Sequence, residues 1–115
     1  AIYEKFVSQA PDFAAGQASS GLLCGVWPYT SADPLPALVN GAGAAPILVV
    51  GTTGDPATPY AWSERMADLL ESGHLLTFVG EGHTGVGGKS ACIDDAAITF
   101  LVSGTLPPEG TRCND

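Results

Sequence analysis

Basic residues are the scarcest class in this sequence. The 115-residue chain has four Lys and Arg against 12 Asp and Glu, a formal net charge of −8 at pH 7. Proteins bind phosphate backbones and anionic membrane surfaces through clustered Lys and Arg side chains. The composition therefore disfavours nucleic acid and anionic membranes as partners.

Long apolar runs are absent too, and no stretch approaches the roughly 20 apolar residues of a membrane-spanning helix. Yet apolar residues make up 45 % of the chain, and the mean hydropathy is +0.22. These values are high for a small domain that exposes its whole surface to water. Residue 1 is Ala rather than Met, and no secretory signal is present. We therefore expect part of a longer polypeptide, for which a missing signal does not decide export.

Cysteine is rare, and its spacing excludes two common uses. The three residues Cys24, Cys92 and Cys113 form no C-x-x-C pair, the spacing typical of zinc sites and redox-active dithiols. Three buried free thiols are one interpretation. We favour a disulfide between Cys92 and Cys113, which both lie in the last quarter, and hence an oxidising compartment. The odd count suggests that one cysteine has its partner in an upstream segment.

The second half of the chain alternates apolar runs with amphipathic stretches. Pro46–Thr53 and Leu75–Val79 are nearly continuous in apolar residues, which is typical of parallel strands covered on both faces. A helix is predicted between them, so strand, helix and strand form a parallel βαβ unit. Because such a unit buries too little to stand alone comfortably, we predict an α/β class: the closing part of a doubly wound sheet.

The two predicted helices of this half carry apolar stripes. The first extends over Thr58–Ser72, with Thr58 as N-cap, Pro59 as first residue and Gly73 just beyond its end. The second extends from the cap Ser90 to Ser103 and is followed by an extended tail. The residues predicted to face the core are Trp62, Met66, Leu69 and Leu70 in the first helix, and Ile93, Ala97, Phe100 and Leu101 in the second.

Two polar residues follow the two predicted strands. Asp55 stands in Gly51-Thr52-Thr53-Gly54-Asp55-Pro56, and His83 stands in Gly80-Glu81-Gly82-His83. The carboxyl ends of parallel strands meet at one edge of a sheet, where open α/β folds place functional groups. A carboxylate bonded to one ring nitrogen of a histidine fixes the tautomer that a general base needs. We therefore predict that Asp55 and His83 are two members of a Ser-His-Asp triad.

The third member is absent, because no serine of this chain lies in a G-x-S-x-G sequence. In α/β-hydrolases the order along the chain is nucleophile, acid and histidine, so a C-terminal portion would hold the last two. Each residue also has a simpler interpretation: Asp before Pro commonly forms a turn, and a loop His is often only solvated. We interpret the other histidine, His74, as structural.

A rival interpretation comes from Gly85-Val86-Gly87-Gly88-Lys89-Ser90, which lies between a strand and a helix as a phosphate-binding loop does. That motif requires Gly, four residues and then Gly-Lys-Ser/Thr. Counting back from Gly88, the position that requires Gly is occupied by His83. The spacing therefore disfavours nucleotide binding.

From Pro46 to Cys113 the sequence resembles the C-terminal region of the tripeptidyl-aminopeptidase-like α/β-hydrolases, secreted serine peptidases. The resemblance rests on PILVVGTTGDPATPYAWSERMADLL, on GEGHTG and on ACIDDAAITFLVSGTLPPEGTRC. The segment LCGVWP (23–28) is similar to the family's return from its helical lid. The resemblance implies Asp55 as triad acid, His83 as triad base, a Cys92–Cys113 disulfide and an upstream partner for Cys24.

These observations predict the C-terminal portion of a secreted or cell-envelope serine hydrolase that releases short peptides from free N-termini. Residues 1–45 would be the end of a lid and an irregular return, and residues 46–115 the last part of the hydrolase domain. The expected partners are the upstream part that carries the nucleophile and a peptide substrate, with no metal or organic cofactor. The alternatives are an esterase that uses the same triad and a non-catalytic chain that binds a partner.

Overall fold

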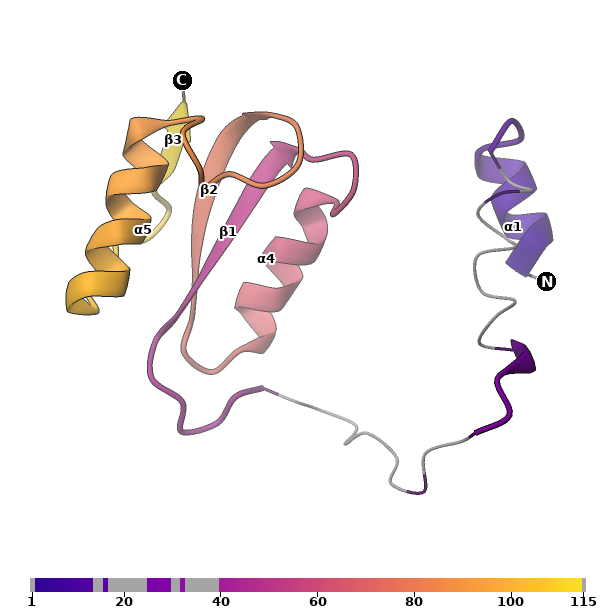
Figure 1. Cartoon of the computed structure of the whole chain (residues 1–115), viewed down its shortest axis with the longest axis horizontal. Coiled ribbons are helices and arrows are strands. Elements are labelled where there is room, and N and C mark those ends of the chain that lie inside the picture. The colour runs from indigo at the N-terminus through magenta and orange to yellow at the C-terminus, as the bar shows by residue number, and fades with distance from the viewer. Residues whose placement is uncertain (1, 14–15, 17–24, 30–31, 33–39, 115) are drawn as a thin grey trace. The chain divides into compact units, whose positions relative to one another are not determined.

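A computed structural model describes residues 2–13, 16, 25–29, 32 and 40–114 of the chain (Figure 1). The chain divides into two compact units, residues 1–35 and 36–115. The first unit contains helix α1 (Ile2–Gln9), which ends before Pro11. Cys24 lies outside the described residues, so its pairing stays a prediction, as does the division at residue 45. Within the described ranges no helix is long and apolar enough to cross a bilayer.

The second unit contains a sheet of three parallel strands. Strands β1 (Ile47–Gly54), β2 (Gly73–Glu81) and β3 (Arg112–Asn114) lie in the order β1-β2-β3. The two apolar runs predicted as parallel strands are confirmed: β1 begins and ends one residue later than predicted, and β2 extends two residues further at each end. The structure differs at the C-terminal tail, where three residues pair with β2 as a third strand, with Cys113 opposite Phe78.

Helices cover both faces of this sheet, with α4 (Tyr60–Leu69) on one side and α5 (Ala91–Ser103) on the other (Figure 1). Successive side chains of a strand point to opposite faces, so β2 contributes to both layers. The core cluster lies on the α5 side and consists of Leu76, Phe78, Ile93 and Cys113, each at most 1 % exposed. This core supports the ends of β1 and β2, which carry the two candidate catalytic residues.

The predicted orientation and limits of α4 are wrong. The helix begins at Tyr60 with Pro59 as N-cap and ends at Leu69, and Gly73 belongs to β2. Trp62, Met66 and Leu69, predicted to face the core, are 62 %, 57 % and 46 % exposed. Instead the helix packs Ser63 and the Tyr60 ring against the sheet, where Gly51 in β1 leaves room for close approach: a Cβ there would lie 2.8 Å from the Cβ of Ser63 and 3.0 Å from the Tyr60 ring.

Helix α5 matches its predicted limits. Ser90 is the N-cap, although its hydroxyl makes no capping bond, and Gly104 ends the helix in the left-handed conformation at φ 72°. Ile93 and Ala97 are buried as predicted, whereas Leu101 is 79 % exposed, so the stripe is narrower than expected. The sheet beneath α5 is too small to cover a wider apolar face.

The disulfide joins Cys92, in the first turn of α5, to Cys113 in β3. The Cα atoms are 5.7 Å apart, a separation within the usual range for this cross-link. Its partners are 21 residues apart in sequence, and Cys113 is 1 % exposed. The cross-link therefore holds the short strand β3 against both β2 and α5.

Candidate active site

The ends of β1 and β2 stay paired up to the loops that carry Asp55 and His83. Past an irregularity in the register, Gly54 lies opposite Glu81, and the Gly82 amide donates to the Gly54 carbonyl at 3.1 Å. The carboxylate of Glu81 lies beside Gly54, in the space that a side chain at residue 54 would enter. The two loops therefore leave the sheet side by side at its carboxyl edge.

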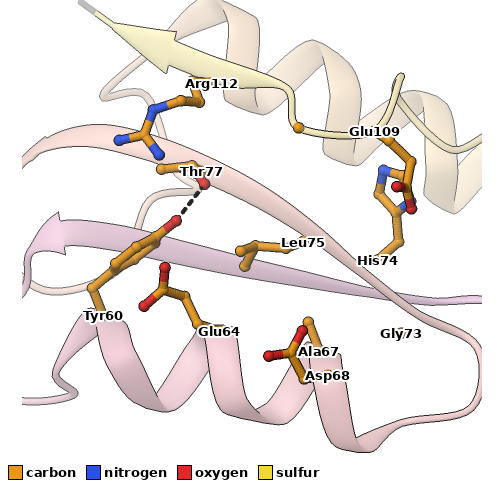
Figure 2. A pocket seen from close by; sticks show the side chains of 11 residues that line it. Tyr60, Glu64, Ala67, Asp68, Gly73, His74, Leu75, Thr77, Glu109 and Arg112 are labelled. Atoms are coloured by element: carbon orange, nitrogen blue, oxygen red, sulfur yellow. Dashed lines mark hydrogen bonds and ion pairs between the residues drawn. The ribbon is translucent and has the colours of Figure 1, made fainter.

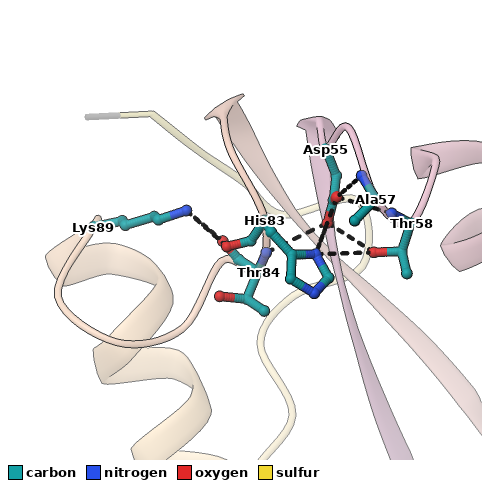
Figure 3. A network of polar contacts seen from close by, with 6 residues as sticks. All are labelled: Asp55, Ala57, Thr58, His83, Thr84 and Lys89. Carbon is teal, nitrogen blue, oxygen red and sulfur yellow. Dashed lines mark hydrogen bonds and ion pairs between the residues drawn. The ribbon is translucent and has the colours of Figure 1, made fainter.

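Asp55 uses one carboxylate oxygen to form a turn. Its Oδ1 accepts hydrogen bonds from the backbone amides of Ala57 at 2.8 Å and Thr58 at 2.9 Å (Figure 3). These are the side-chain-to-backbone bonds typical of an Asp that precedes a turn. The hydroxyl of Thr58, predicted as a helix cap, donates instead to Asp55 Oδ2 at 2.8 Å. The turn-forming role predicted as the alternative is therefore present, and it orients the carboxylate.

The same carboxylate contacts His83. Nδ1 of the ring lies 3.0 Å from Oδ2 and 3.1 Å from Oδ1, and the Thr84 amide donates to Oδ2 at 3.3 Å. The Asp55 side chain is 4 % exposed, whereas that of His83 is 55 % exposed. In Figure 3 the second ring nitrogen lies on the far side of the ring from Asp55. An Nδ1–H that donates to the carboxylate leaves the lone pair of Nε2 free to accept a proton.

These contacts lower the pKa of Asp55 well below its usual range. The largest cause is the hydrogen bond from the Thr58 amide, and the Thr58 hydroxyl, the Ala57 amide and His83 act in the same direction. Burial opposes them by penalising the charge. Because donors favour the ionised form, Asp55 is a carboxylate throughout the pH range in which a histidine titrates.

The glycine-rich loop after His83 is held by two charged residues. Lys89 Nζ donates to the carbonyl of His83 at 2.9 Å and to that of Thr84 at 3.0 Å. The carboxylate of Asp94 accepts from the amides of Gly87 at 2.8 Å and Gly88 at 2.7 Å. In a phosphate-binding loop these amides and the lysine would face the phosphates. Here they bind protein groups, which is a further observation against nucleotide binding.

A second concave region lies on the α4 side of the sheet, away from both loops. A hollow of about 400 Å³ opens between α4, β2 and the segment before β3, as the side chains in Figure 2 show. In it the Tyr60 hydroxyl lies 2.7 Å from Thr77 Oγ1. His74, interpreted as structural, has a side chain 9 % exposed with Nδ1 3.9 Å from Glu109 Oε1. Neither Asp55 nor His83 lines this hollow.

The sequence singled out Asp55 and His83 but not the residues that hold them. Thr58 was predicted only as a helix cap, and Lys89 only as part of a phosphate-binding motif. No role was predicted for Thr84. A turn-forming Asp was predictable at residue 55, but no sequence signal marks the bond from the Thr58 hydroxyl to its carboxylate. No comparable signal marks Lys89, whose partners are backbone carbonyls.

A parallel sheet with helices on both faces agrees with part of an α/β-hydrolase fold, in which an acid and a histidine follow strands of the sheet. This class agrees with the comparison to known families. The chain belongs to the family described as TAP-like protein, which matches residues 10–113.

Relatives within this class carry several activities in their names. The chain is 42 % identical over 90 residues to serine protease Hip1 of Mycobacterium tuberculosis, covering 78 % of this chain and 17 % of the relative. It is 40 % identical over 108 residues to carboxylesterase B of the same organism, covering 90 % and 20 %. It is 31 % identical over 93 residues to a tripeptidyl aminopeptidase of Streptomyces lividans, covering 80 % and 17 %. The chain thus spans about a fifth of their length.

Proposed function

We propose that this chain supplies the acid and the base of the catalytic triad of a serine exopeptidase, with Asp55 and His83 in these roles. The observation that carries the proposal is the 3.0 Å contact between Asp55 Oδ2 and His83 Nδ1 at the carboxyl edge of the sheet. The contact has the arrangement that a triad needs, because the carboxylate fixes the ring and stabilises the imidazolium when it forms.

The chemistry follows from this geometry. His83 Nε2 would take the proton of a serine hydroxyl as that oxygen attacks the scissile carbonyl, and would return it to the leaving amine. Asp55 would keep the ring in the Nδ1–H tautomer throughout. The chain itself would bind no metal or organic cofactor for these steps, because each is a proton transfer or an acyl transfer.

The nucleophilic serine would come from a longer polypeptide of which this chain is the C-terminal portion. Three observations support this. No G-x-S-x-G occurs in the sequence, and the chain spans only 17–20 % of the relatives described above. Moreover, large apolar side chains on the outer faces of the helices, such as Trp62 and Leu101, are 62 % and 79 % exposed. Exposed apolar patches typically mark surfaces that another part of a protein covers.

The compartment would be extracellular or the cell envelope. The support is the Cys92–Cys113 disulfide, since such cross-links persist mainly in oxidising environments. Peptide substrates are suggested by the relatives named as a protease and an aminopeptidase.

An esterase is the second candidate, because the relative named carboxylesterase B covers 90 % of this chain at 40 % identity. The same triad can attack an ester or an amide, and the pocket that selects the substrate would lie in the longer polypeptide. A non-catalytic chain that only binds a partner is the third possibility, and it predicts that His83 is dispensable.

The test compares this chain with the longer polypeptide that carries it. We expect the 115-residue chain to show no turnover of an unblocked tripeptide arylamide or a short nitrophenyl ester, because the nucleophile is absent. We expect the longer polypeptide to hydrolyse the arylamide and to lose this activity on His83→Ala. The matched control is His74→Ala, outside the proposed site.

Three results would contradict the proposal. Saturable turnover by the short chain, abolished by His83→Ala, would place the nucleophile within it. Equal activity of the longer polypeptide and its His83→Ala variant would show that His83 is not the base of a catalytic triad. Turnover of the ester without turnover of the arylamide would favour the esterase.

A further inference from the structure

Lys89 makes an unusual pair of contacts for an exposed lysine. Its ammonium donates to two successive carbonyls, those of His83 and Thr84, at 2.9 and 3.0 Å. Among the described residues no carboxylate forms an ion pair with it. The lysine side chain also passes close to the loop, since a Cβ at Gly82 would lie 3.0 Å from Nζ. The contacts therefore fix the backbone on both sides of Thr84.

The peptide unit between His83 and Thr84 is held at both ends. Its carbonyl oxygen accepts from Lys89, and its amide donates to Asp55 Oδ2 at 3.3 Å. A cation, a peptide dipole and a carboxylate thus lie in one chain of hydrogen bonds. Hydrogen bonds in such a chain polarise one another, so the lysine strengthens the bond from the Thr84 amide to the Asp55 carboxylate. The orientation of this one peptide is thus tied to both Lys89 and Asp55.

The local backbone needs such support. Thr84 has φ 65°, and in the described part of the chain it is the one residue other than glycine with a positive φ. Side chains other than glycine disfavour this conformation, which persists where surrounding contacts impose it. The two Lys89 contacts flank Thr84 directly, whereas Asp94 holds the loop further on, at the amides of Gly87 and Gly88.

We propose that Lys89 is a positioning residue for His83, acting through the His83–Thr84 peptide rather than by contact with the ring or a substrate. This inference rests on the proposed function, in which His83 is the general base. Lys89 keeps the imidazole in the Nδ1–H tautomer by keeping its backbone where Nδ1 reaches Asp55. Loss of the lysine should leave the sheet and α5 intact while freeing the ring.

The tautomer of His83 can be measured directly, because the chain contains two histidines, His74 and His83. Two-bond ¹H–¹⁵N spectra of the isotope-labelled 115-residue chain report the tautomer of each ring, and His74→Gln assigns the signals. The spectra are recorded near pH 8.5, about two units above the ordinary pKa of histidine. We expect His83 of the unaltered chain to show the Nδ1–H tautomer.

The variant that tests the proposal is Lys89→Met, which keeps the side chain's length and removes its donors. We expect the His83 signal to shift toward the Nε2–H tautomer while the His74 signal stays unchanged. The matched control is Lys5→Met, which removes the other lysine, on α1, and should change neither ring. Lys89→Arg keeps a cation with several donors and should restore part of the Nδ1–H population.

An unchanged His83 tautomer in Lys89→Met would overturn the proposal. A changed His74 signal would show that the Met variant is misfolded. Lys89→Gln is then used in its place, and an unchanged His83 tautomer in that variant would likewise overturn the proposal. In the longer hydrolase we expect Lys89→Met to lower kcat by up to ~100-fold with KM nearly unchanged, the scale of a misplaced catalytic group. Absence of activity in the unaltered hydrolase would refute the proposed function but not the tautomer result.

Discussion

Asp55→Asn is the substitution that separates a triad acid from a turn former. In the structure Oδ1 serves the turn, through the amides of Ala57 and Thr58. Oδ2 accepts from the Thr58 hydroxyl, the Thr84 amide and His83. An asparagine with its oxygen in the Oδ1 position keeps both turn bonds and presents an NH₂ group to the three donors at Oδ2.

The consequence for His83 follows from proton positions. An NH₂ group cannot accept from Nδ1–H, so the ring must turn its Nδ1 lone pair toward residue 55 and carry its proton on Nε2. That tautomer cannot take a proton from a serine. The same substitution lowers kcat by about 10⁴-fold in the serine-protease example from which this triad logic is known. We expect a loss of several orders of magnitude in the longer hydrolase, with the fold retained.

The assay is turnover of an unblocked tripeptide arylamide by the longer hydrolase, together with denaturant unfolding of the 115-residue chain. Asp95→Asn is the matched control, because this exposed residue of α5 takes no part in the contacts of Asp55 and His83. If Asp55 only forms the turn, Asn substitutes almost silently, since it makes the same bonds. Turnover of Asp55→Asn within a few-fold of the unaltered enzyme would therefore refute the triad.

Three further outcomes are expected. Cys92→Ser opens the disulfide and should lower the free energy of unfolding by about 3 kcal/mol in urea titrations, from the loop-closure entropy of a 21-residue separation. Because folding lowers the pKa of Asp55, its ionised carboxylate stabilises the folded chain. This stabilisation is complete above about pH 4, the pKa of an unfolded Asp, and is lost as the pH falls through the lower pKa of the folded state. The stability difference between the unaltered chain and Asp55→Asn should therefore shrink in acid. Gly51→Ala should destabilise the chain by about 1–3 kcal/mol, because the added Cβ would collide with α4. Gly25→Ala is the control and should have little effect, because a Cβ there has no atom within 4 Å.

The elements with strong local signals were predicted well. Continuous apolar runs identify β1 and β2, and a capping Ser with a terminal Gly identifies the limits of α5. The proximity of Asp55 and His83 was predictable for the same reason. A helix that joins two consecutive strands makes them parallel, and parallel strands end at one edge.

Other elements depend on neighbours distant in the sequence. Strand β3 consists of Arg112–Asn114, with no apolar alternation, and its position depends on β2 and the disulfide. The face that α4 turns to the sheet depends on the missing side chain of Gly51, against which Tyr60 and Ser63 pack, whereas Trp62 and Met66 stay exposed. A hydrophobic period identifies a helix but not which partner its apolar side meets.

By itself, then, the sequence determined the βαβ order and the two residues proposed for catalysis, because both follow from local patterns and from the geometry of parallel strands. Tertiary structure alone decided how those residues are held. The carboxylate of Asp55 is shared between a turn and His83, and Lys89 reaches back to two carbonyls five and six residues earlier. Backbone carbonyls are present at every residue, so a contact to one of them leaves no pattern in the sequence, and only the folded loop selects it.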